Sequence, residues 1–281
     1  MNGDDKSLLS DSEFQEISDA IDDEIQYIQK YWEELNFDDN EDIQHLAMML
    51  KEAFRPSVPS RIPGHKVVSP MRPQVCSMIA LVTDMRNSTE HLLNDYKQFS
   101  GPGKRLFRVH VETGALIAAT ATLVQLRGGD TPEFLGDGCL SFFDYDIQNQ
   151  SQRVKQAYSC GLAVVDAVRT LVNPKLSLIG IPNIEIGVGI AASKSIITVV
   201  GVQGNYLPKV IGECVYRASK CSRGINAVAM DISAKGIYPK SKGGKRKFAK
   251  YRTNLGKYRS TVYMEKSKGF LPLKWYLEDK S

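Results

Sequence analysis

The stretch CSMIALVTDMRNST, at residues 76–89, decides how this chain folds. Its first seven residues are almost all apolar and have the length of a buried strand, which we expect to end at Thr83 and Asp84. A helix start is predicted directly after the strand, because three residues of capping type follow: Asn87, Ser88 and Thr89. The pattern therefore predicts a central strand with an aspartate at its end, followed by a short helix.

The sequence after this stretch alternates helical and strand patterns. We expect a loop at 100–104, a helix at 105–127, two short strands around Phe134 and Leu140 joined by a GDG turn, a helix at 151–172, two β-rich segments within 184–201, a helix at 213–226, and strands near Val262 and Trp275. Long crossover helices combined with a tight hairpin predict an α+β sheet with helices on one face.

Two segments precede the apolar strand. Residues 12–53 place apolar side chains at helical spacing between acidic ones, which predicts an amphipathic helix and a second, short helix from about residue 41 to 54. Five prolines between Arg55 and Pro73 predict a linker or an extended strap. We therefore divide the chain into an acidic helical extension at 1–54, a Pro-rich linker at 55–73 and a main domain at 74–281 with a basic C-terminal part.

The composition is that of a folded chain, since 42% of the 281 residues are hydrophobic and 24% are charged. The formal net charge of +4 hides a strong asymmetry. Residues 1–54 hold 16 Asp and Glu against three Lys, whereas residues 235–281 hold 14 Lys and Arg against three acids. A basic end is typical of nucleic-acid binding, but the acidic end can neutralise it by folding over it. No nucleic-acid partner is expected.

The location of the protein follows from what the sequence lacks. No apolar run reaches the roughly 18 residues of a membrane span, because Glu185 and Lys194 break the most apolar stretch. The N-terminus MNGDDKSLLS is acidic and has no apolar core, so a secretory leader is not expected. The five cysteines are an odd number with no CxxC pair, which argues against a disulfide framework or a zinc site. We expect a cytoplasmic protein without a membrane partner.

Two carboxylates occupy positions where they could act together: Asp84 ends the buried strand, and Asp137 lies in the GDG turn. Adjacent strands of one sheet would bring them to the same edge, where two negative charges repel unless Mg²⁺ or Mn²⁺ lies between them. Two such ions could hold a triphosphate and activate a hydroxyl nucleophile. Taken singly, each aspartate is more simply explained as the end of a strand or as part of an Asp-Gly turn.

Four strings resemble, in order and spacing, the successive motifs of class III nucleotide cyclases: ALVTDMRNST, EFLGDGCLSFF, IEIGVGIAASKSIITVVG and PKVIGECVYRASK. Each string is weak alone, and their common order gives the resemblance its strength. It covers roughly residues 75–230. The resemblance implies an α+β fold with a ferredoxin-like βααββαββ core and an N-terminal helical extension. It also implies that residues 74–281 are a cyclase catalytic domain.

The resemblance implies roles for the residues that match the motifs. In the family, the aspartates at the positions of Asp84 and Asp137 bind two divalent ions, Mn²⁺ or Mg²⁺, and the carbonyl at Met85 is a further ligand. The amides at the following helix start would hold phosphate oxygens: Arg86, Asn87, Ser88 and Thr89. The family's active sites lie at a head-to-tail dimer interface. The resemblance therefore implies a nucleoside triphosphate substrate and a homodimer with shared sites.

Four positions depart from the family's pattern. Adenylyl cyclases usually read the base with Lys and Asp, where this chain has Glu133 and Lys209, and guanylyl cyclases have Glu at the first position but typically Cys at the second. The family's transition-state Asn and Arg fall on Tyr216 and Lys220, so the amide is lost while a cation remains to neutralise the α-phosphate. Two nearby cations could replace it if the register differs: Arg217 and Arg223.

The base follows less directly from the residues. Glu133 can accept a hydrogen bond from the N3–H of uracil while Lys209 donates to a uracil carbonyl, whereas cytosine lacks that proton. Guanine's N1–H and O6 suit the same pair. The DMR(G/N)ST form of the first motif resembles a bacterial branch, the Pycsar type, that makes cyclic pyrimidine nucleotides as alarm signals in phage defence, and this favours UTP and cyclic UMP. CTP, GTP or ATP cyclases of the same fold and a catalytically silent nucleotide-binding module stay as alternatives.

Overall fold

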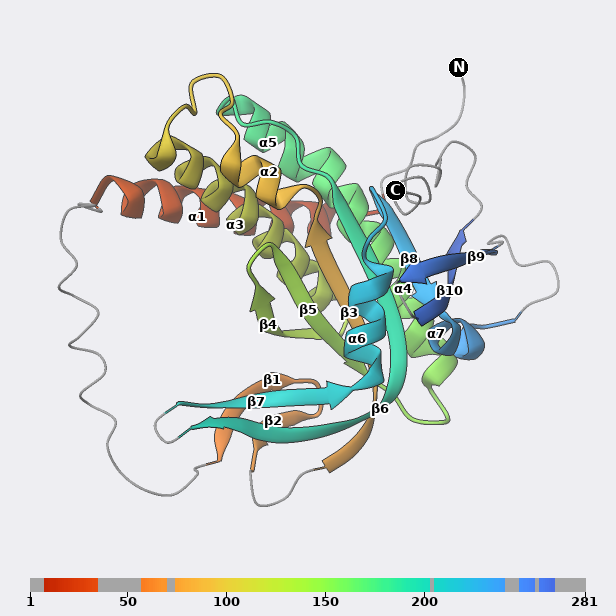
Figure 1. The fold of residues 1–281 in the computed structure, drawn as a ribbon. Coiled ribbons are helices and arrows are strands. Elements are labelled where there is room, and N and C mark those ends of the chain that lie inside the picture. The colour runs from red at the N-terminus through yellow and green to blue at the C-terminus, as the bar shows by residue number, and fades with distance from the viewer. Residues whose placement is uncertain are drawn as a thin grey trace.

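The computed structural model describes residues 8–34, 57–69, 74–202, 205–240, 248–255 and 258–265. An eight-stranded, mostly antiparallel sheet lies at its centre, with strand order β4-β5-β3-β6-β8-β10-β9 and with β7 paired to β6 off this path (Figure 1). Its strands are β3 (Gln74–Met85), β4 (Asp130–Leu135), β5 (Gly138–Asp144), β6 (Ile186–Val202), β7 (Asn205–Gly212), β8 (Ala227–Asp231), β9 (Phe248–Leu255) and β10 (Tyr258–Glu265). β1 (Val58–Ile62) and β2 (His65–Val68) form a separate hairpin.

The helices are α1 (Asp11–Glu34), α2 (Ser88–Leu93), α3 (Pro102–Leu126), α4 (Gln150–Ala167), α5 (Asn173–Leu178), α6 (Glu213–Cys221) and α7 (Ile232–Ile237). A π-helical turn, Val168–Val172, joins α4 to α5. The chain order β3-α2-α3-β4-β5-α4 followed by β6 and β7 is the βααββαββ order that the resemblance implies. The expected α+β class is therefore confirmed.

Strand β3 lies at the centre because it is buried on both faces. Ile79 and Leu81 belong to one apolar cluster, whereas Met78 and Ala80 belong to the other, as the alternation of side chains along a strand requires. β3 pairs antiparallel with β5 on one side and with β6 on the other. A strand covered on both faces reads as a continuous apolar run, which is why the sequence shows it clearly.

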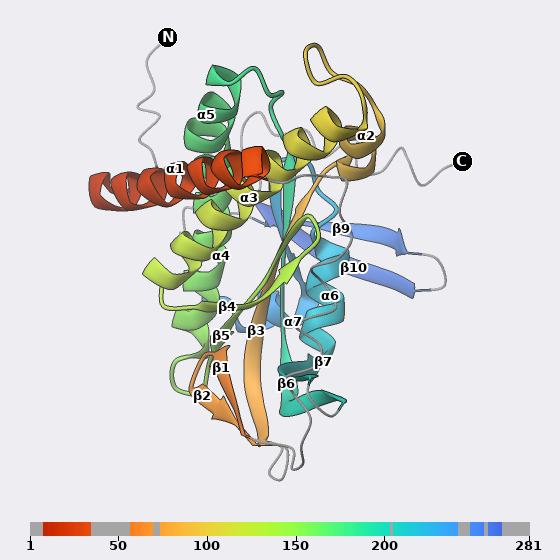
Figure 2. The same ribbon diagram turned by 90° about the vertical axis from the view of Figure 1, so that its left-hand side faces the viewer.

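Helices cover both faces of the sheet (Figure 2). α3 and α4 lie on one face, and α6 lies on the opposite face, where Cys214 and Ala218 join the cluster of Met78. The expectation that all helices share one face is therefore wrong. α6 can approach β6 closely because Gly187 and Gly189 have no side chain. A Cβ at Gly189 would overlap the backbone of the last turn of α6, and one at Gly187 would overlap the Ser222 carbonyl directly after it.

The region expected to hold two β-rich segments, residues 184–201, forms the single strand β6, and β7 is its partner. Two serines interrupt the apolar pattern without breaking the strand, because they bind the start of α6. Ser193 Oγ accepts the Cys214 N–H at 3.0 Å, and Ser195 Oγ lies 3.2 Å from Cys214 Sγ. The strand therefore continues through 193–195, where the expectation of two segments implied a break.

Other boundaries also differ from the expectation. The range 55–73 includes the hairpin β1–β2, turned at Gly64 with φ of 77°, rather than a linker alone. α3 begins at Pro102, inside the expected loop, because proline suits a first helical turn. The helix expected at 151–172 continues through the π-turn into α5, and the helix expected at 213–226 is α6, which ends at Cys221. The helix expected at 41–54 and the strand near Trp275 lie outside the described residues.

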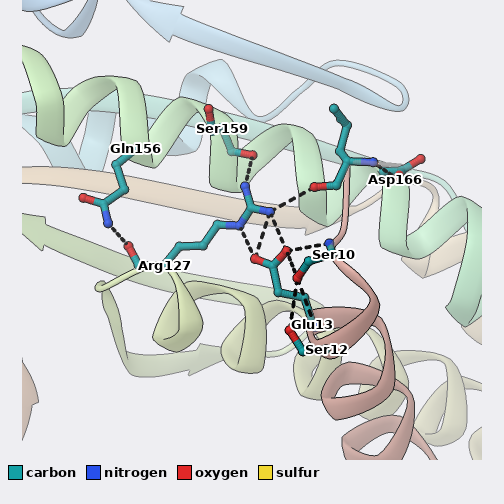
Figure 3. Close-up of polar contacts among 8 residues, drawn as sticks. Ser10, Ser12, Glu13, Arg127, Gln156, Ser159 and Asp166 are labelled. Atoms are coloured by element: carbon teal, nitrogen blue, oxygen red, sulfur yellow. Dashed lines mark hydrogen bonds and ion pairs between the residues drawn. The ribbon is translucent and has the colours of Figure 1, made fainter. Parts of the chain in front are cut away.

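The N-terminal helix α1 packs on α3. Ile17 and Ile21 are fully buried in the cluster that α3 and α4 line. Figure 3 shows the polar contacts at the start of α1, where Arg127 Nε donates to Glu13 Oε1 at 3.0 Å and Arg127 Nη1 donates to the Ser159 carbonyl at 3.2 Å. These contacts join α1 to the end of α3 and to the middle of α4.

Helix α3 is, within the described part of the chain, the one helix whose length and composition would allow it to cross a membrane. Half of its most apolar window is buried, and it carries two charged side chains inside the protein, Arg108 and Glu112. Both features are typical of the core helix of a folded domain.

The five cysteines are free thiols, and four of them are buried. Burial raises the pKa of Cys139 and of Cys160 to about 12. These two thiols stay protonated at neutral pH and pack as small apolar side chains.

Candidate active site

Two aspartates lie at one edge of the central sheet. Asp84, near the end of β3, pairs with Gly138 at the start of β5, and Asp137 forms the turn directly before Gly138. Met85 N–H donates to the Asp137 carbonyl at 3.0 Å. Glycine is required at 138 because a Cβ there would overlap the Thr83 carbonyl. Strand pairing thus brings the two aspartates to the same edge, as the sequence led us to expect.

Each carboxylate has a partner from the segment that follows β3. The Arg86 guanidinium forms an ion pair with Asp84. Ser88 Oγ donates to Asp137 Oδ2 at 2.5 Å. Ser88 and Asp137 lie 49 residues apart in the chain, so their hydrogen bond ties the first residue of α2 to the β4–β5 hairpin.

Arg86 is held in an unusual electrostatic environment. Burial lowers the pKa of its guanidinium; the charge of Asp137 acts in the opposite direction, and the nearby Arg223 lowers the pKa further. Its Nε is buried without a hydrogen-bond partner. The carboxylates of Asp84 and Asp137, which we call the carboxylate edge, attract the positive charge of the guanidinium and so offset the free-energy cost of burying it.

The donor set at this edge suits a hard divalent cation. Asp84 and Asp137 offer carboxylate oxygens, which Mg²⁺ and Mn²⁺ prefer. The Met85 backbone lies beside Asp137, since its N–H donates to the Asp137 carbonyl. No group of three or more His, Cys, Asp or Glu occurs among the residues that the structure describes. A cation here takes its remaining ligands from backbone, water or substrate, and the residues present fit it.

The turn between β3 and α2 is built around Asn87, whose φ of 56° lies in the left-handed region that asparagine tolerates better than most residues. Asn87 and Thr89 are exposed, and neither contacts a carboxylate in the described contacts. The helix start has no side-chain cap, although three capping residue types occur there. The hydroxyl of Ser88 serves Asp137 instead.

Glu133 and Lys209 meet, although 76 residues separate them in the sequence. Glu133 is on β4, Lys209 is on β7, and the Lys209 ammonium forms an ion pair with Glu133 Oε2. The side chains are 18% and 37% exposed, so the pair lies at a surface that a ligand could reach. The two residues expected to read the base are therefore neighbours within one chain.

Tyr216 and Lys220 are on α6 and contact each other. The Lys220 ammonium lies 5.3 Å from the centroid of the Tyr216 ring, and Tyr216 is 53% exposed. Among the described contacts none links either residue to Asp84 or Asp137. The structure thus brings the expected site residues together in three groups, which are the carboxylate edge, the Glu133–Lys209 pair and the exposed side of α6.

The two alternative cations behave differently. Arg217 is held by Glu213 at 2.6 Å and by Asp231 at 3.4 Å, which makes it part of the packing of α6. Arg223 is exposed and lies near enough to Arg86 to lower its pKa. Arg223 therefore adds positive charge near Arg86, and its expected alternative role as a replacement for Lys220 stays a prediction.

These features define the class of the fold. No protein-family model matches the sequence, and no curated protein sequence matches it. Solved structures do match, and they identify the architecture as that of class III nucleotide cyclases.

Three solved structures illustrate the match. The guanylyl cyclase Cya2 has a TM-score of 0.54 and 18% identity, over 70% of this chain and 94% of that chain. The adenylyl cyclase CyaB from P. aeruginosa has a TM-score of 0.55 and 16% identity, over 71% and 99%. A class III adenylyl cyclase-like ATP-binding protein from Pseudomonas aeruginosa has a TM-score of 0.53 and 18% identity, over 71% and 42%. At these identities the likeness establishes the fold.

Proposed function

We propose that the chain is a metal-dependent nucleotidyl cyclase that converts a ribonucleoside triphosphate into its 3′,5′-cyclic monophosphate and pyrophosphate. The observation that carries this proposal is the placement of Asp84 and Asp137 at one edge of a class III cyclase fold. The 3′-oxygen attacks the α-phosphorus in line, the bond between the α-phosphorus and the leaving pyrophosphate breaks, and the 3′-hydroxyl proton passes to solvent water. Two ions, Mn²⁺ or Mg²⁺, would lower the pKa of that hydroxyl and neutralise the triphosphate.

The residues at the carboxylate edge bind and orient. Asp84, Asp137 and the Met85 carbonyl hold the ions, and Ser88 fixes the orientation of Asp137 through its hydrogen bond. The backbone amides of 87–89 would hold phosphate oxygens in the turn that Asn87 shapes. The expectation for the Arg86 amide is wrong, because its N–H already donates to the Glu185 carbonyl at 2.7 Å. This part of the site supplies position and charge rather than a covalent intermediate.

The exposed side of α6 completes the site in a second copy of the chain. Lys220 would neutralise charge on the α-phosphate and Tyr216 would contact the nucleotide, each from the copy opposite the carboxylates. A head-to-tail homodimer is supported by apolar side chains that are exposed on the strands around the Glu133–Lys209 pair: Phe134, Leu135, Ile196, Leu207 and Ile211.

The Glu133–Lys209 pair supports a uracil base. The Glu133 carboxylate and the Lys209 ammonium lie side by side. A nucleotide base that binds between them would therefore meet one hydrogen-bond acceptor and one donor. Uracil offers an N3–H to Glu133 and a carbonyl oxygen to Lys209, whereas cytosine has no N3–H and could donate to Glu133 only through its 4-amino group, with the ring shifted in the pocket. UTP is therefore the proposed substrate and cyclic UMP the product.

The resemblance to the Pycsar branch leads us to propose that cyclic UMP is a signal in phage defence. Phage should form fewer plaques on cells that express the wild-type chain than on cells that express Asp84→Asn. Equal plating of phage on both strains would count against this role.

A silent nucleotide-binding module is the second candidate. It is favoured by the Arg86–Asp84 ion pair, which already occupies one of the two carboxylates. It is also consistent with the ATP-binding protein among the structural matches. Nucleotide binding without any product would identify it.

The decisive experiment is incubation of the purified chain with each of the four ribonucleoside triphosphates and Mn²⁺ or Mg²⁺, with products identified by mass. We expect cyclic UMP from UTP. Cyclic GMP or cyclic AMP as the exclusive product would refute the base assignment but not the cyclase. Absence of every cyclic nucleotide, with nucleotide bound, would favour the silent module.

A substitution at Glu133 tests the base assignment directly. Glu133→Gln keeps an acceptor for uracil but adds an amide donor that suits cytosine N3, so the preference for UTP over CTP should fall about tenfold or more. The ratio of kcat/KM for the two substrates measures it. Asp130→Asn makes the same chemical change on the same strand and should leave the ratio unchanged. An unaltered ratio in Glu133→Gln would remove Glu133 from the base pocket.

A further inference from the structure

Helix α2 joins the β3 edge to the hairpin edge, because its first residue, Ser88, holds Asp137. None of its side chains is buried, and its two leucines, Leu92 and Leu93, are 39% and 65% exposed. A six-residue helix without an apolar anchor is not stable on its own. Something other than hydrophobic packing therefore holds α2 in place.

An arginine of α3 binds the end of α2. Arg108 is 3% exposed, and its Nη2 donates to the carbonyls of His91 and Asn94, the latter at 3.0 Å. Carbonyls in the last turn of a helix lack partners within the helix, so Arg108 satisfies groups that would otherwise need water. It also lies over the Tyr96 ring, 5.8 Å from its centroid.

A second buried charge completes the cluster. Glu112 lies one turn after Arg108 and is fully buried. Its Oε2 is 2.9 Å from His91 Nδ1, and its Oε1 is 3.6 Å from Arg108 Nε. Breaking a buried pair leaves one charge uncompensated, which is costly, so each of the three side chains depends on the others.

A neighbouring ion pair is a weaker anchor for this region. Asp95, in the loop after α2, accepts from Arg105 at 2.6 Å and from the Gly101 N–H at 3.1 Å. The Asp95 side chain is 50% exposed, and exposed ion pairs contribute little because water and salt screen them. The buried cluster must therefore carry most of the attachment of α2 to α3.

We propose that Arg108, Glu112 and His91 are positioning residues: they hold α2 on α3 and thereby keep the Ser88 hydroxyl on Asp137. The proposal deepens the proposed function, since it assigns to Asp137 a support that lies outside the cation site. None of the three side chains contacts Asp84 or Asp137 in the described contacts. Their effect reaches the carboxylate edge through the backbone of α2.

The test uses the whole chain with Arg108→Met and Glu112→Leu combined, because apolar replacements leave no single buried charge behind. Glu112→Gln, which keeps the shape of the side chain, is the second variant. The control combines Arg153→Met with Asp144→Leu and removes an ion pair between α4 and β5. For each variant we would measure the hydrogen exchange of amides 88–94, the Mn²⁺ affinity by electron paramagnetic resonance and the thermal midpoint.

Both cluster variants should exchange amides 88–94 at least about tenfold faster than wild type, while the control does not. Their Mn²⁺ affinity should fall about ten- to a hundredfold, the size expected for losing one hydrogen bond to a charged group. Ser88→Ala should cause a similar fall. Adding Ser88→Ala to the cluster variant should lower the affinity no further, because both changes break the same contact.

Wild-type exchange at 88–94 in both cluster variants would overturn the inference, and so would Mn²⁺ losses that add to those of Ser88→Ala. The exchange measurement needs neither metal nor substrate, so it decides the attachment of α2 even for a chain that does not turn over nucleotide. Failure of the proposed function would look different. The wild-type chain would then form no cyclic nucleotide, while the cluster variants still loosen α2.

Discussion

The carboxylate edge and the exposed side of α6 are both parts of the proposed site, yet they differ in how complete each is within one chain. At the edge, Asp84 meets Arg86 and Asp137 meets Ser88. On α6, more than half of the Tyr216 side chain faces outward, and Lys220 lies over its ring. Within one chain the two carboxylates of the proposed cation site have partners, whereas the proposed transition-state residues on α6 contact neither carboxylate in the described contacts; a site shared between two copies would show this asymmetry.

The largest loss of activity should come from substitutions at the carboxylate edge. Asp84→Asn or Asp137→Asn removes a carboxylate from the cation site, so turnover should fall at least about 100- to 1000-fold. The thermal midpoint should stay close to that of wild type, because both side chains lie at an edge rather than in the core. Asp144→Asn, at the other end of β5, is the matched control and should keep its activity. Wild-type rates in Asp84→Asn and Asp137→Asn would exclude the two-ion assignment.

Mixing two inactive variants tests whether the carboxylate edge of one chain and α6 of another form one site. Asp137→Asn removes a carboxylate from the carboxylate edge and Lys220→Ala removes the cation on α6, so each variant alone should be inactive. In an equilibrated equal mixture half of the dimers contain both variants, and one of their two sites is intact, so about a quarter of wild-type activity should return. Size and composition of the dimers are checked by native mass spectrometry. Mixed dimers that form but stay inactive would show that the two halves do not meet across an interface.

A smaller effect is expected where Arg86 competes for Asp84. Arg86→Gln removes the positive charge at the carboxylate edge, so Mn²⁺ should bind about tenfold more tightly without nucleotide. Titration followed by electron paramagnetic resonance measures the affinity. Arg61→Gln, which removes an arginine paired with Asp130 on β4, is the control. Equal or weaker Mn²⁺ binding in Arg86→Gln would mean that the guanidinium supports the cation site instead of competing for it.

The same comparison shows how far the sequence could lead. β3, the hairpin turn and the meeting of Asp84 with Asp137 follow from local patterns, because an apolar run and an Asp-Gly turn are visible within a few residues. The meeting of Glu133 with Lys209 was expected only through the resemblance. It depends on β7 reaching toward β4, which no local pattern describes.

Contacts between distant side chains were not predictable. Ser88 was expected to cap a helix, but the structure pairs it with Asp137, 49 residues away. Arg108 and Glu112 show only an i, i+4 spacing on a helix, which is the pattern of an ordinary surface pair. Their burial depends on α2 covering them, and His91 gives no sign of this in the sequence.

The smallest expected effect is a change in stability at α1. Like the carboxylate edge, α1 finds its polar partners within the same chain. Arg127 binds Glu13 at the start of the helix, and Lys175 binds Asp22 at 2.6 Å further along (Figure 3 shows the first contact). Glu13→Gln weakens a charged hydrogen bond, so the free energy of unfolding should fall by about 1 kcal/mol. Cyclase activity should not change, because α1 touches neither half of the proposed site in the described contacts.

The effect of Glu13 should also depend on pH. Burial alone would raise the pKa of Glu13, but hydrogen bonds from Ser10 and the charge of Arg127 outweigh burial and hold the pKa below its ordinary value of 4.5. The folded state therefore favours the ionised form, and this stabilisation is fully present above pH 4.5 and is lost as the pH falls through the lowered pKa. Urea unfolding of wild type and Glu13→Gln should give free energies that differ at pH 7 and converge in acid. Glu16→Gln, an exposed change on the same helix, should follow wild type throughout. A difference between wild type and Glu13→Gln that persists unchanged below the lowered pKa would show that Glu13 stabilises α1 through shape rather than charge.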